Sequence, residues 1–107
     1  MNNLYRKRSA TIEARQLGGD MANYHSICIY LWIKANVGSF DPLSEETQTS
    51  GVSIDPSDGS LMIASPLGVM HARRDDWIIR GVDGEFYPCR DNIFRATYEP
   101  VGEACHG

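Results

Sequence analysis

Hydrophobic and polar residues alternate in short runs along most of this chain, and one longer stretch departs from that pattern. Residues Ala10–Arg15 alternate strictly between apolar and polar side chains, which is typical of a half-buried strand. The turn-forming sequence Gly18-Gly19-Asp20 then interrupts the alternation. We therefore expect a first strand that ends before Gly18.

The stretch from Met21 to Asn36 has the period of an α-helix. Asp20 or Asn23 is available as its N-terminal cap, and Gly38 is a natural C-terminal stop. A strand is the alternative interpretation, because some residues off the helical stripe are β-branched or aromatic. The length of the run favours the helix. The apolar residues recur at intervals of three and four, on one stripe: Tyr24, Ile27, Cys28, Leu31, Trp32 and Ala35.

Beyond this helix the pattern predicts a polar loop and then hairpins. Residues 39–51 are polar and rich in turn formers, so we interpret them as an exposed loop. Val52–Ile54 and Ser60–Ala64 alternate on either side of the turn sequence PSDG, which predicts a hairpin. A second turn leads into a further strand at Val69–Arg73.

Aromatic residues are concentrated in the C-terminal third, where the pattern predicts two neighbouring strands. Trp77–Arg80 and Glu85–Tyr87 flank the turn sequence GVDG. Asp-Gly is a strong hairpin signal, because glycine takes a positive φ without steric cost. Pro88 has no N–H to donate, so we expect it to end its strand or to lie at a sheet edge.

The remaining residues complete the prediction of a single α+β domain over residues 1–107. We expect Asp91 to cap a one-turn helix at Asn92–Arg95, Ala96–Val101 to form a last strand, and residues 102–107 to be a flexible tail. Five or six strands should form one curled, mostly antiparallel sheet packed against the main helix. Five aromatic residues should lie in or beside the core: Trp32, Trp77, Phe86, Phe94 and Tyr98.

Composition narrows the class of partner. The 107 residues are 42% hydrophobic and 22% charged, as is usual for one globular domain. The net charge of −4 argues against a general nucleic-acid binder, which would carry a basic excess. Two basic clusters, Arg6-Lys7-Arg8 and Arg73-Arg74, are interpreted first as solvated charges and otherwise as a local basic patch.

Cysteine usage and the length of apolar runs indicate a soluble protein of the cytoplasm. The three cysteines are far apart and fit no metal-binding spacing, which argues against a disulfide framework and a structural metal. The amino terminus lacks the apolar segment of a secretory signal. The longest apolar run, Ile27–Ile33, is too short to span a membrane. No cofactor is indicated.

No catalytic motif stands out in the sequence. The best acid–base candidate is His71 with Arg73 and Asp75, because alternation puts His71 and Arg73 on one strand face. Strand surface residues without a catalytic role are the simpler interpretation. Cys89 is a candidate nucleophile only if it is exposed, and free cysteines are usually buried. The sequence therefore favours a protein that is not an enzyme.

A polar–aromatic groove is the best binding candidate in the C-terminal third. Glu85 and Glu99 are each next to aromatic residues on predicted strands, and together with Arg80 and Tyr87 they could line a groove for a small ligand or a peptide. The simpler alternative is an exposed cross-strand ion pair between Arg80 and Glu85, which contributes little stability. The candidate binding residues are Arg80, Glu85, Tyr87, Arg73, His71 and Glu99.

Both ends of the chain resemble a known family. The resemblance is carried by Tyr5-Arg6-Lys7 followed by Glu13-Ala14, by the run DWIIRGVDGEFYPC at residues 76–89, and by ATYEPV at residues 96–101. These segments resemble small proteins common in bacteriophage and prophage genomes, and are similar to the domain named for its PGDYG motif. Where that family has Pro-Gly-Asp, this chain has Arg74-Asp75-Asp76. The resemblance implies a phage origin and expression inside an infected bacterium, and it supplies no catalytic mechanism.

These observations lead to hypotheses of different classes. The first is a non-enzymatic bacteriophage accessory protein that binds a host macromolecule, for host takeover or against a host defence. The second is a binder of a small, nucleotide-like ligand, which would use Arg80, Tyr87 and the basic residues Arg6, Lys7 and Arg73. An enzyme that uses His71 or Cys89 is a weaker third hypothesis.

Overall fold

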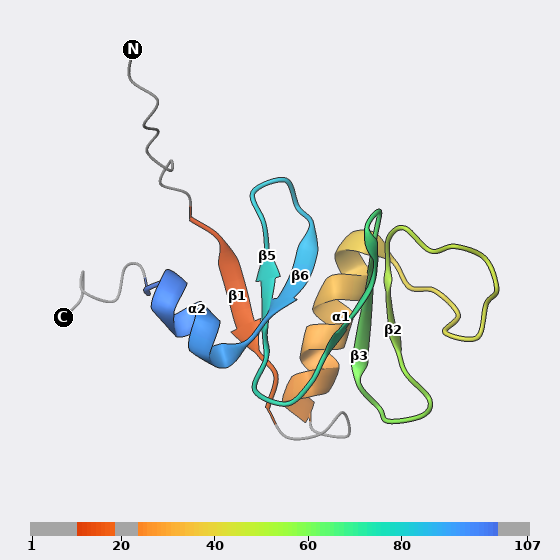
Figure 1. The fold of residues 1–107 in the computed structure, drawn as a ribbon, viewed down its shortest axis with the longest axis horizontal. Coiled ribbons are helices and arrows are strands. Elements are labelled where there is room, and N and C mark those ends of the chain that lie inside the picture. Colours follow the sequence, from red (N-terminus) through yellow and green to blue (C-terminus); the bar gives the residue numbers. More distant parts are fainter. Residues whose placement is uncertain (1–10, 19–23, 101–107) are drawn as a thin grey trace, which may run out of the picture.

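The protein has an α+β fold, as the sequence predicts. The computed structural model describes residues 11–18 and 24–100, which contain two helices and six strands (Figure 1). In chain order the elements are β1 (Glu13–Gln16), α1 (Tyr24–Val37), β2 (Val52–Ile54), β3 (Leu61–Ser65), β4 (Gly68–Ala72), β5 (Trp77–Arg80), β6 (Phe86–Cys89) and α2 (Asp91–Thr97). The predicted strands at residues 52–54, 60–64, 69–73 and 77–80 are confirmed to within one residue at each end.

Some predictions concern residues outside the described part of the chain. They are the strand start at Ala10, the helix start at Met21 with its cap at Asp20 or Asn23, the basic cluster Arg6-Lys7-Arg8, the strand end at Val101 and the tail at 102–107.

The strands form two antiparallel sheets of three strands, not the single sheet that the sequence predicts. One sheet has the order β1-β5-β6 and the other the order β2-β3-β4. β4 lies next to β6, but no ladder joins these two among the described strands. The turn Arg73–Asp76 carries the chain from β4 in one sheet to β5 in the other. Alternation identifies most strands but does not show which strands pair.

The β1-β5-β6 sheet is covered on both faces. Because side chains alternate along β5, Ile78 lies on one face of the sheet and Ile79 on the other, and both side chains are fully buried. On the first face, the ring of Phe86 in β6 meets the ring of Trp32 in α1 edge-on at 5.1 Å. On the second face, Trp77 stacks on a phenylalanine of α2. This sheet therefore lies between the two helices (Figure 1).

The main core lies where α1 meets residues of both sheets. Its helical members are Ile29 and Ile33, both fully buried. Removal of these apolar side chains from water supplies most of the favourable free energy that holds the layers together. The strand residues of the same cluster are Val52, Leu61, Ile63, Ala72, Ile78 and Phe86.

The helix prediction is confirmed over the strand alternative, but the buried face differs from the predicted stripe. Ile27 and Leu31, which lie on that stripe, are 41% and 52% exposed, whereas Ile29 and Ile33 are fully buried. The reason is that α1 is apolar on nearly every side, so its periodicity does not identify one face. Gly38 ends the helix as predicted, with φ +79° and an N–H that donates to the carbonyl of the fourth residue before it.

The C-terminal segment differs from the prediction after β6. The last strand predicted at Ala96–Val101 is wrong over its described part, because α2 continues to Thr97 and no strand follows it up to residue 100. A longer helix places the rings of Phe94 and Tyr98, four residues apart, in one stack of rings. The predicted cap at Asp91 is also wrong, since Arg90 occupies the cap position and no side chain caps the helix.

Two further predictions can be compared with the fold. Pro88 lies within β6, which is an edge strand of its sheet, in agreement with the expected position. Residues 39–51 contain neither helix nor strand, apart from an isolated bridge between Ser39 and Val52. Neither helix in the described ranges has the length and apolar character that a membrane span requires.

Candidate functional site

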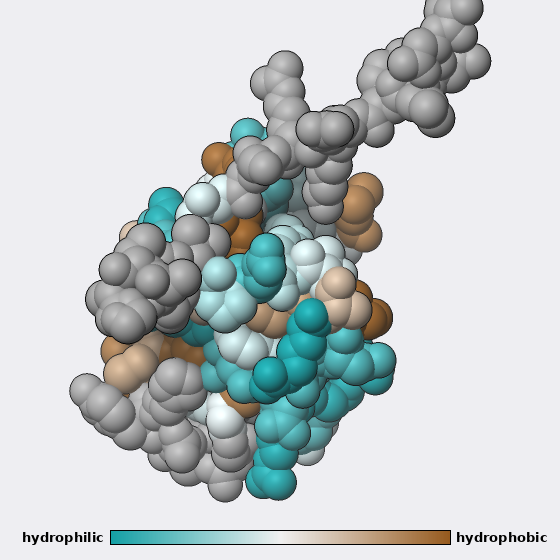
Figure 2. Space-filling model, turned by 90° about the vertical axis from the view of Figure 1, so that its left-hand side faces the viewer, coloured by the Kyte–Doolittle hydropathy of each residue, from teal (hydrophilic) through white to brown (hydrophobic). Residues whose placement is uncertain are grey.

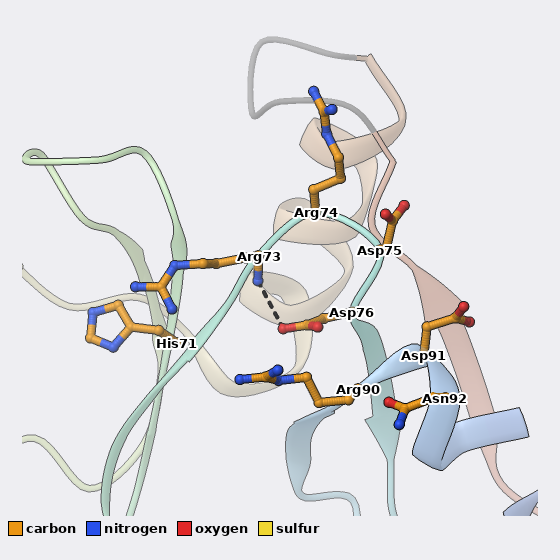
Figure 3. Close-up of a pocket in the computed structure, with 8 residues that line it drawn as sticks. All are labelled: His71, Arg73, Arg74, Asp75, Asp76, Arg90, Asp91 and Asn92. Carbon is orange, nitrogen blue, oxygen red and sulfur yellow. Dashed lines mark hydrogen bonds between the residues drawn. The ribbon is translucent and has the colours of Figure 1, made fainter. Parts of the chain in front are cut away.

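An open, polar cleft of about 490 Å³ lies where the β4–β5 turn meets the start of α2 (Figure 3). Three short segments position its walls: the end of β4, the turn that follows it, and the junction of β6 with α2. The cleft contains two of the predicted binding residues, His71 and Arg73. The full set of lining residues is His71, Arg73, Arg74, Asp75, Asp76, Arg90, Asp91 and Asn92.

The turn between β4 and β5 is fixed by its own hydrogen bonds. The backbone N–H of Arg73 donates to Asp76 Oδ2 at 3.0 Å, and the N–H of Asp76 donates to the carbonyl of Arg73 at 3.0 Å. Between them Asp75 has φ +72°, a left-handed conformation that glycine favours and aspartate tolerates.

Basic side chains gather on one side of the cleft. His71 Nε2 is 3.2 Å from Asp55 Oδ2, and Arg73 Nη2 is 3.5 Å from Asp58 Oδ2. Figure 3 shows the side chains of Arg73 and Arg90 extending toward His71, whereas Asp75 and Asp91 project to the opposite side. The guanidinium of Arg90 has no ion pair with any described residue.

Two carboxylates outside the cleft support these basic groups. Hydrogen bonds from the side chain and backbone of Ser57 hold the pKa of Asp55 below its ordinary value, and the backbone N–H of Ser60 does the same for Asp58. Both carboxylates are therefore ionised at neutral pH. They orient the side chains of His71 and Arg73 while other N–H donors of the guanidinium stay available.

Asp91 joins the cleft to the aromatic layer, which is the stack of the Trp77, Phe94 and Tyr98 rings at α2. Its Oδ1 accepts hydrogen bonds from Trp77 Nε1 at 2.9 Å, Arg95 Nε at 2.8 Å and Gln16 Nε2 at 3.2 Å. The indole N–H of Trp77 is the main cause of a lowered pKa at Asp91, and Arg95 and Gln16 add to it. This carboxylate holds β1, β5 and α2 together.

The acid–base grouping predicted around His71 is not assembled. His71 contacts Asp55, while the side chain of Asp75 projects away from it (Figure 3). Ser57 Oγ donates to Asp55 and not to the imidazole, so these three residues lack the serine-to-histidine contact of a catalytic triad. Burial raises the pKa of the Cys89 thiol, which disfavours the reactive thiolate.

The structure does not bring the predicted polar–aromatic groove together. Arg80 Nη1 lies 3.4 Å from Glu13 Oε1, so the ion pair of Arg80 is with β1 and not with Glu85. Glu85 Oε1 instead accepts the backbone N–H of Asp83 at 3.1 Å. Tyr87 pairs with Ile79 across the sheet and shares its face, opposite the face that carries Arg80.

Glu99 lines a second, more apolar groove of about 360 Å³ beside the aromatic layer. The rings of Trp77 and Phe94 stack there at a centroid distance of 4.0 Å, and Tyr98 continues the stack at 5.0 Å. The remaining lining residues are Thr11, Ile12, Ala14 and Pro100.

The cleft also contains residues that the sequence did not single out as binding candidates. Arg74, Arg90 and Asn92 join it only because the β4–β5 turn and the start of α2 meet in space. The sequence shows Arg73-Arg74 as a basic cluster, but nothing in the local pattern indicates that Arg90 lies at the same cleft. The face on the left of Figure 1 is shown in Figure 2, where hydrophilic side chains gather over a continuous area and apolar ones form smaller areas.

Comparison with models of protein families, with curated proteins and with solved structures gives no match for this chain. The resemblance to the PGDYG-motif domain therefore stays a prediction from the sequence. Within the described ranges, no group of three or more His, Cys, Asp or Glu residues is placed to hold a metal ion.

Proposed function

We propose that this chain is a non-enzymatic binding protein, and that its cleft docks an acidic group of a macromolecular partner. The observation that carries the proposal is Arg90, which lines the cleft and whose guanidinium has no ion pair with any described residue. Arg74 also lines the cleft without such an ion pair, and Figure 3 shows its side chain directed away from Arg90. Arginine is enriched at protein interfaces because its planar fork pairs with carboxylates and phosphates at low desolvation cost.

The surrounding residues support binding in preference to catalysis. Asp55, Asp76 and Asp91 are engaged in hydrogen bonds that fix turns and join elements. A general acid or base needs a tuned group free to reach substrate, and these carboxylates serve structural roles. With the phage origin implied by the sequence resemblance, the proposed partner is a protein of the bacterial host.

The proposal predicts that the protein captures one partner from a lysate, and that this capture depends on the arginines of the cleft. The protein is immobilised, incubated with bacterial lysate, and the retained proteins are identified by mass spectrometry and then purified for direct binding. Capture should be lost in the double variant Arg74→Ala/Arg90→Ala and kept in Lys34→Ala, which removes an exposed cation from α1. Removal of two interfacial arginines should weaken direct binding by about tenfold or more. Equal capture by both variants would contradict the proposal.

A second candidate, a small nucleotide-like ligand, is favoured by the size of the cleft. Its volume of about 490 Å³ lies within the range of small-molecule pockets, and Asn92 adds an amide that can both donate and accept hydrogen bonds. A panel of nucleotides in a thermal-shift experiment tests it, because a bound ligand raises the melting temperature. Flat melting curves at millimolar nucleotide would remove this candidate.

A further inference from the structure

We propose that the group recognised by the cleft is a phosphate, held by Arg73 and Arg90 beside His71. This inference deepens the proposed function and rests on it, because it names the chemistry of the acidic group that docks. It assigns a binding site to the side of the cleft where Figure 3 shows two guanidinium groups extending toward the imidazole, with the Asp76 carboxylate on the same side.

The arrangement of the donors favours phosphate over carboxylate. His71 lies in β4 and Arg73 directly follows this strand, whereas Arg90 directly follows β6, so the basic groups come from two segments that are distant in sequence. A planar carboxylate is satisfied by one guanidinium fork, whereas a tetrahedral phosphate presents three oxygens in different directions. Two guanidinium groups from segments distant in sequence therefore match the phosphate better.

The neighbouring carboxylates hold the basic side chains in position without using all the N–H donors of the guanidinium groups. Asp58 contacts one N–H group of the Arg73 guanidinium and leaves its other N–H groups for a ligand. Asp55 contacts Nε2 of His71, so the imidazole offers a second N–H to a ligand only when it is protonated. Asp76 already accepts the backbone N–H of Arg73 at 3.0 Å. Arg90 supplies a full guanidinium with no ion pair among the described residues, and it is the expected main anchor.

Two sources can present this chemistry: a free phosphate-bearing small molecule and a phosphorylated side chain of a protein partner. Both carry a dianion near neutral pH, because the second pKa of a phosphate monoester is about 6. The site recognises the shared group, and the rest of the ligand determines which source binds more tightly.

The experiment is an NMR titration of the full chain with inorganic phosphate, and with acetate as the carboxylate control, at pH 7.5 and constant ionic strength. Saturable shifts of the Arg73 and Arg90 side-chain Nε–H signals are expected with phosphate, and weaker or unsaturated shifts with acetate. In Arg90→Ala the dissociation constant for phosphate should rise about tenfold, the loss of one charge-assisted contact. Lys34→Ala should leave it unchanged, and circular dichroism shows that each variant is folded.

The remaining outcomes separate this inference from the proposed function. Tighter binding of AMP or of a phosphoserine peptide than of inorganic phosphate supports the site and assigns its source. The inference is overturned if phosphate binding does not saturate, if phosphate binds no more tightly than acetate, or if phosphate affinity is unchanged in both Arg73→Ala and Arg90→Ala. If that result accompanies Arg90-dependent capture of a protein partner, the proposed function stands with a carboxylate as the docked group.

Discussion

The indole N–H of Trp77 donates a hydrogen bond to Asp91 Oδ1 at 2.9 Å, and this contact joins β5 to the first turn of α2. The same pair borders two features of the protein. The Asp91 carboxylate lines the polar cleft, while the Trp77 ring stacks on Phe94 and lines the apolar groove. Shape at the cleft therefore depends on packing in the aromatic layer.

This contact predicts a specific loss of stability in acid. The pKa of Asp91 is lowered in the fold, chiefly by the Trp77 hydrogen bond, from the value of about 3.9 in unfolded chains. Asp91 therefore stabilises the fold above pH 4, and this contribution is lost as the pH falls through the lowered value. Asp91→Asn should be less stable than wild type at pH 7, with a difference that shrinks below pH 4.

Chemical denaturation as a function of pH measures this difference. Trp77→Phe keeps an aromatic ring on Phe94 but removes the indole donor, so the carboxyl ¹³C signal of Asp91 should titrate at higher pH in that variant. A difference between wild type and Asp91→Asn that stays constant from pH 7 to pH 2 would contradict the prediction.

The second prediction concerns the core between α1 and the β1-β5-β6 sheet. Phe86 is 4% exposed and its ring contacts Trp32, whereas Leu67 lies in the β3–β4 turn and is 99% exposed. Phe86→Ala should lower the free energy of unfolding by about 3–5 kcal/mol, because it removes buried area and leaves a cavity. Leu67→Ala should change it by less than about 0.5 kcal/mol. Urea denaturation of both variants measures the contrast, and similar losses would contradict this position of the core.

Much of this fold was predictable because local patterns determine it. Alternation located most strands, and the GVDG sequence located a turn in which Gly84 has φ +85°. The face of α1 was not predictable, because nearly every side of that helix is apolar. The length of α2 was not predictable either, since Tyr98 joins the ring stack only after β5 and α2 have come together.

The candidate site was predictable only in part, for a related reason. His71 lies in β4 and Arg73 directly follows this strand, so their closeness in sequence was enough to predict that they lie together. Arg90 reaches them through the pairing of β5 with β6, and Arg80 pairs with Glu13 through the pairing of β1 with β5. Such contacts between distant segments depend on which strands are neighbours, and the local pattern does not contain that information.

The third prediction tests the left-handed residue of the β4–β5 turn. Asp75 has φ +72°, which costs an L-residue roughly 1–2 kcal/mol, and its side chain makes no hydrogen bond to the described residues. Asp75→Gly should raise the free energy of unfolding by up to about 1 kcal/mol, after the entropy of glycine in the unfolded chain is subtracted. Asp75→Ala should lower it, since alanine lacks the tolerance of aspartate for this conformation. Thermal denaturation of both variants gives the sign, and a less stable glycine variant would contradict the prediction.

The fourth prediction concerns the contact between Gly81 and Glu85 across the β5–β6 hairpin. A Cβ at Gly81 would meet the Glu85 carboxylate at 2.5 Å, and that carboxylate accepts the N–H of Asp83. Gly81→Ala should displace the flexible carboxylate and lower the free energy of unfolding by about 0.5–1.5 kcal/mol, the value of one hydrogen bond. In a Glu85→Ala background the same change should be neutral or stabilising, because φ of Gly81 is not positive. A double-mutant cycle measures this coupling, and additive effects would contradict it.

The last prediction concerns Tyr87, which faces α2. Burial, then the hydrogen bond and charge of Tyr98, then the charge of Glu85, raise the pKa of Tyr87 to about 12. Since tyrosine in the unfolded chain ionises near pH 10, at about its ordinary pKa, Tyr87 stabilises the fold below pH 10. This contribution is lost as the pH rises from about 10 through 12, because the unfolded chain releases the proton first.

Absorbance at 295 nm should therefore show an ionisation step of Tyr87 near pH 12, as long as the chain stays folded. In Tyr98→Phe that step should move to lower pH, but stay above pH 10, because burial is the largest cause and the substitution leaves it in place. Tyr30→Phe removes a tyrosine from α1 and should leave the step unchanged. The absence of a step near pH 12 in the wild type, or a step that Tyr98→Phe does not move, would show that α2 does not cover this face of the sheet as described.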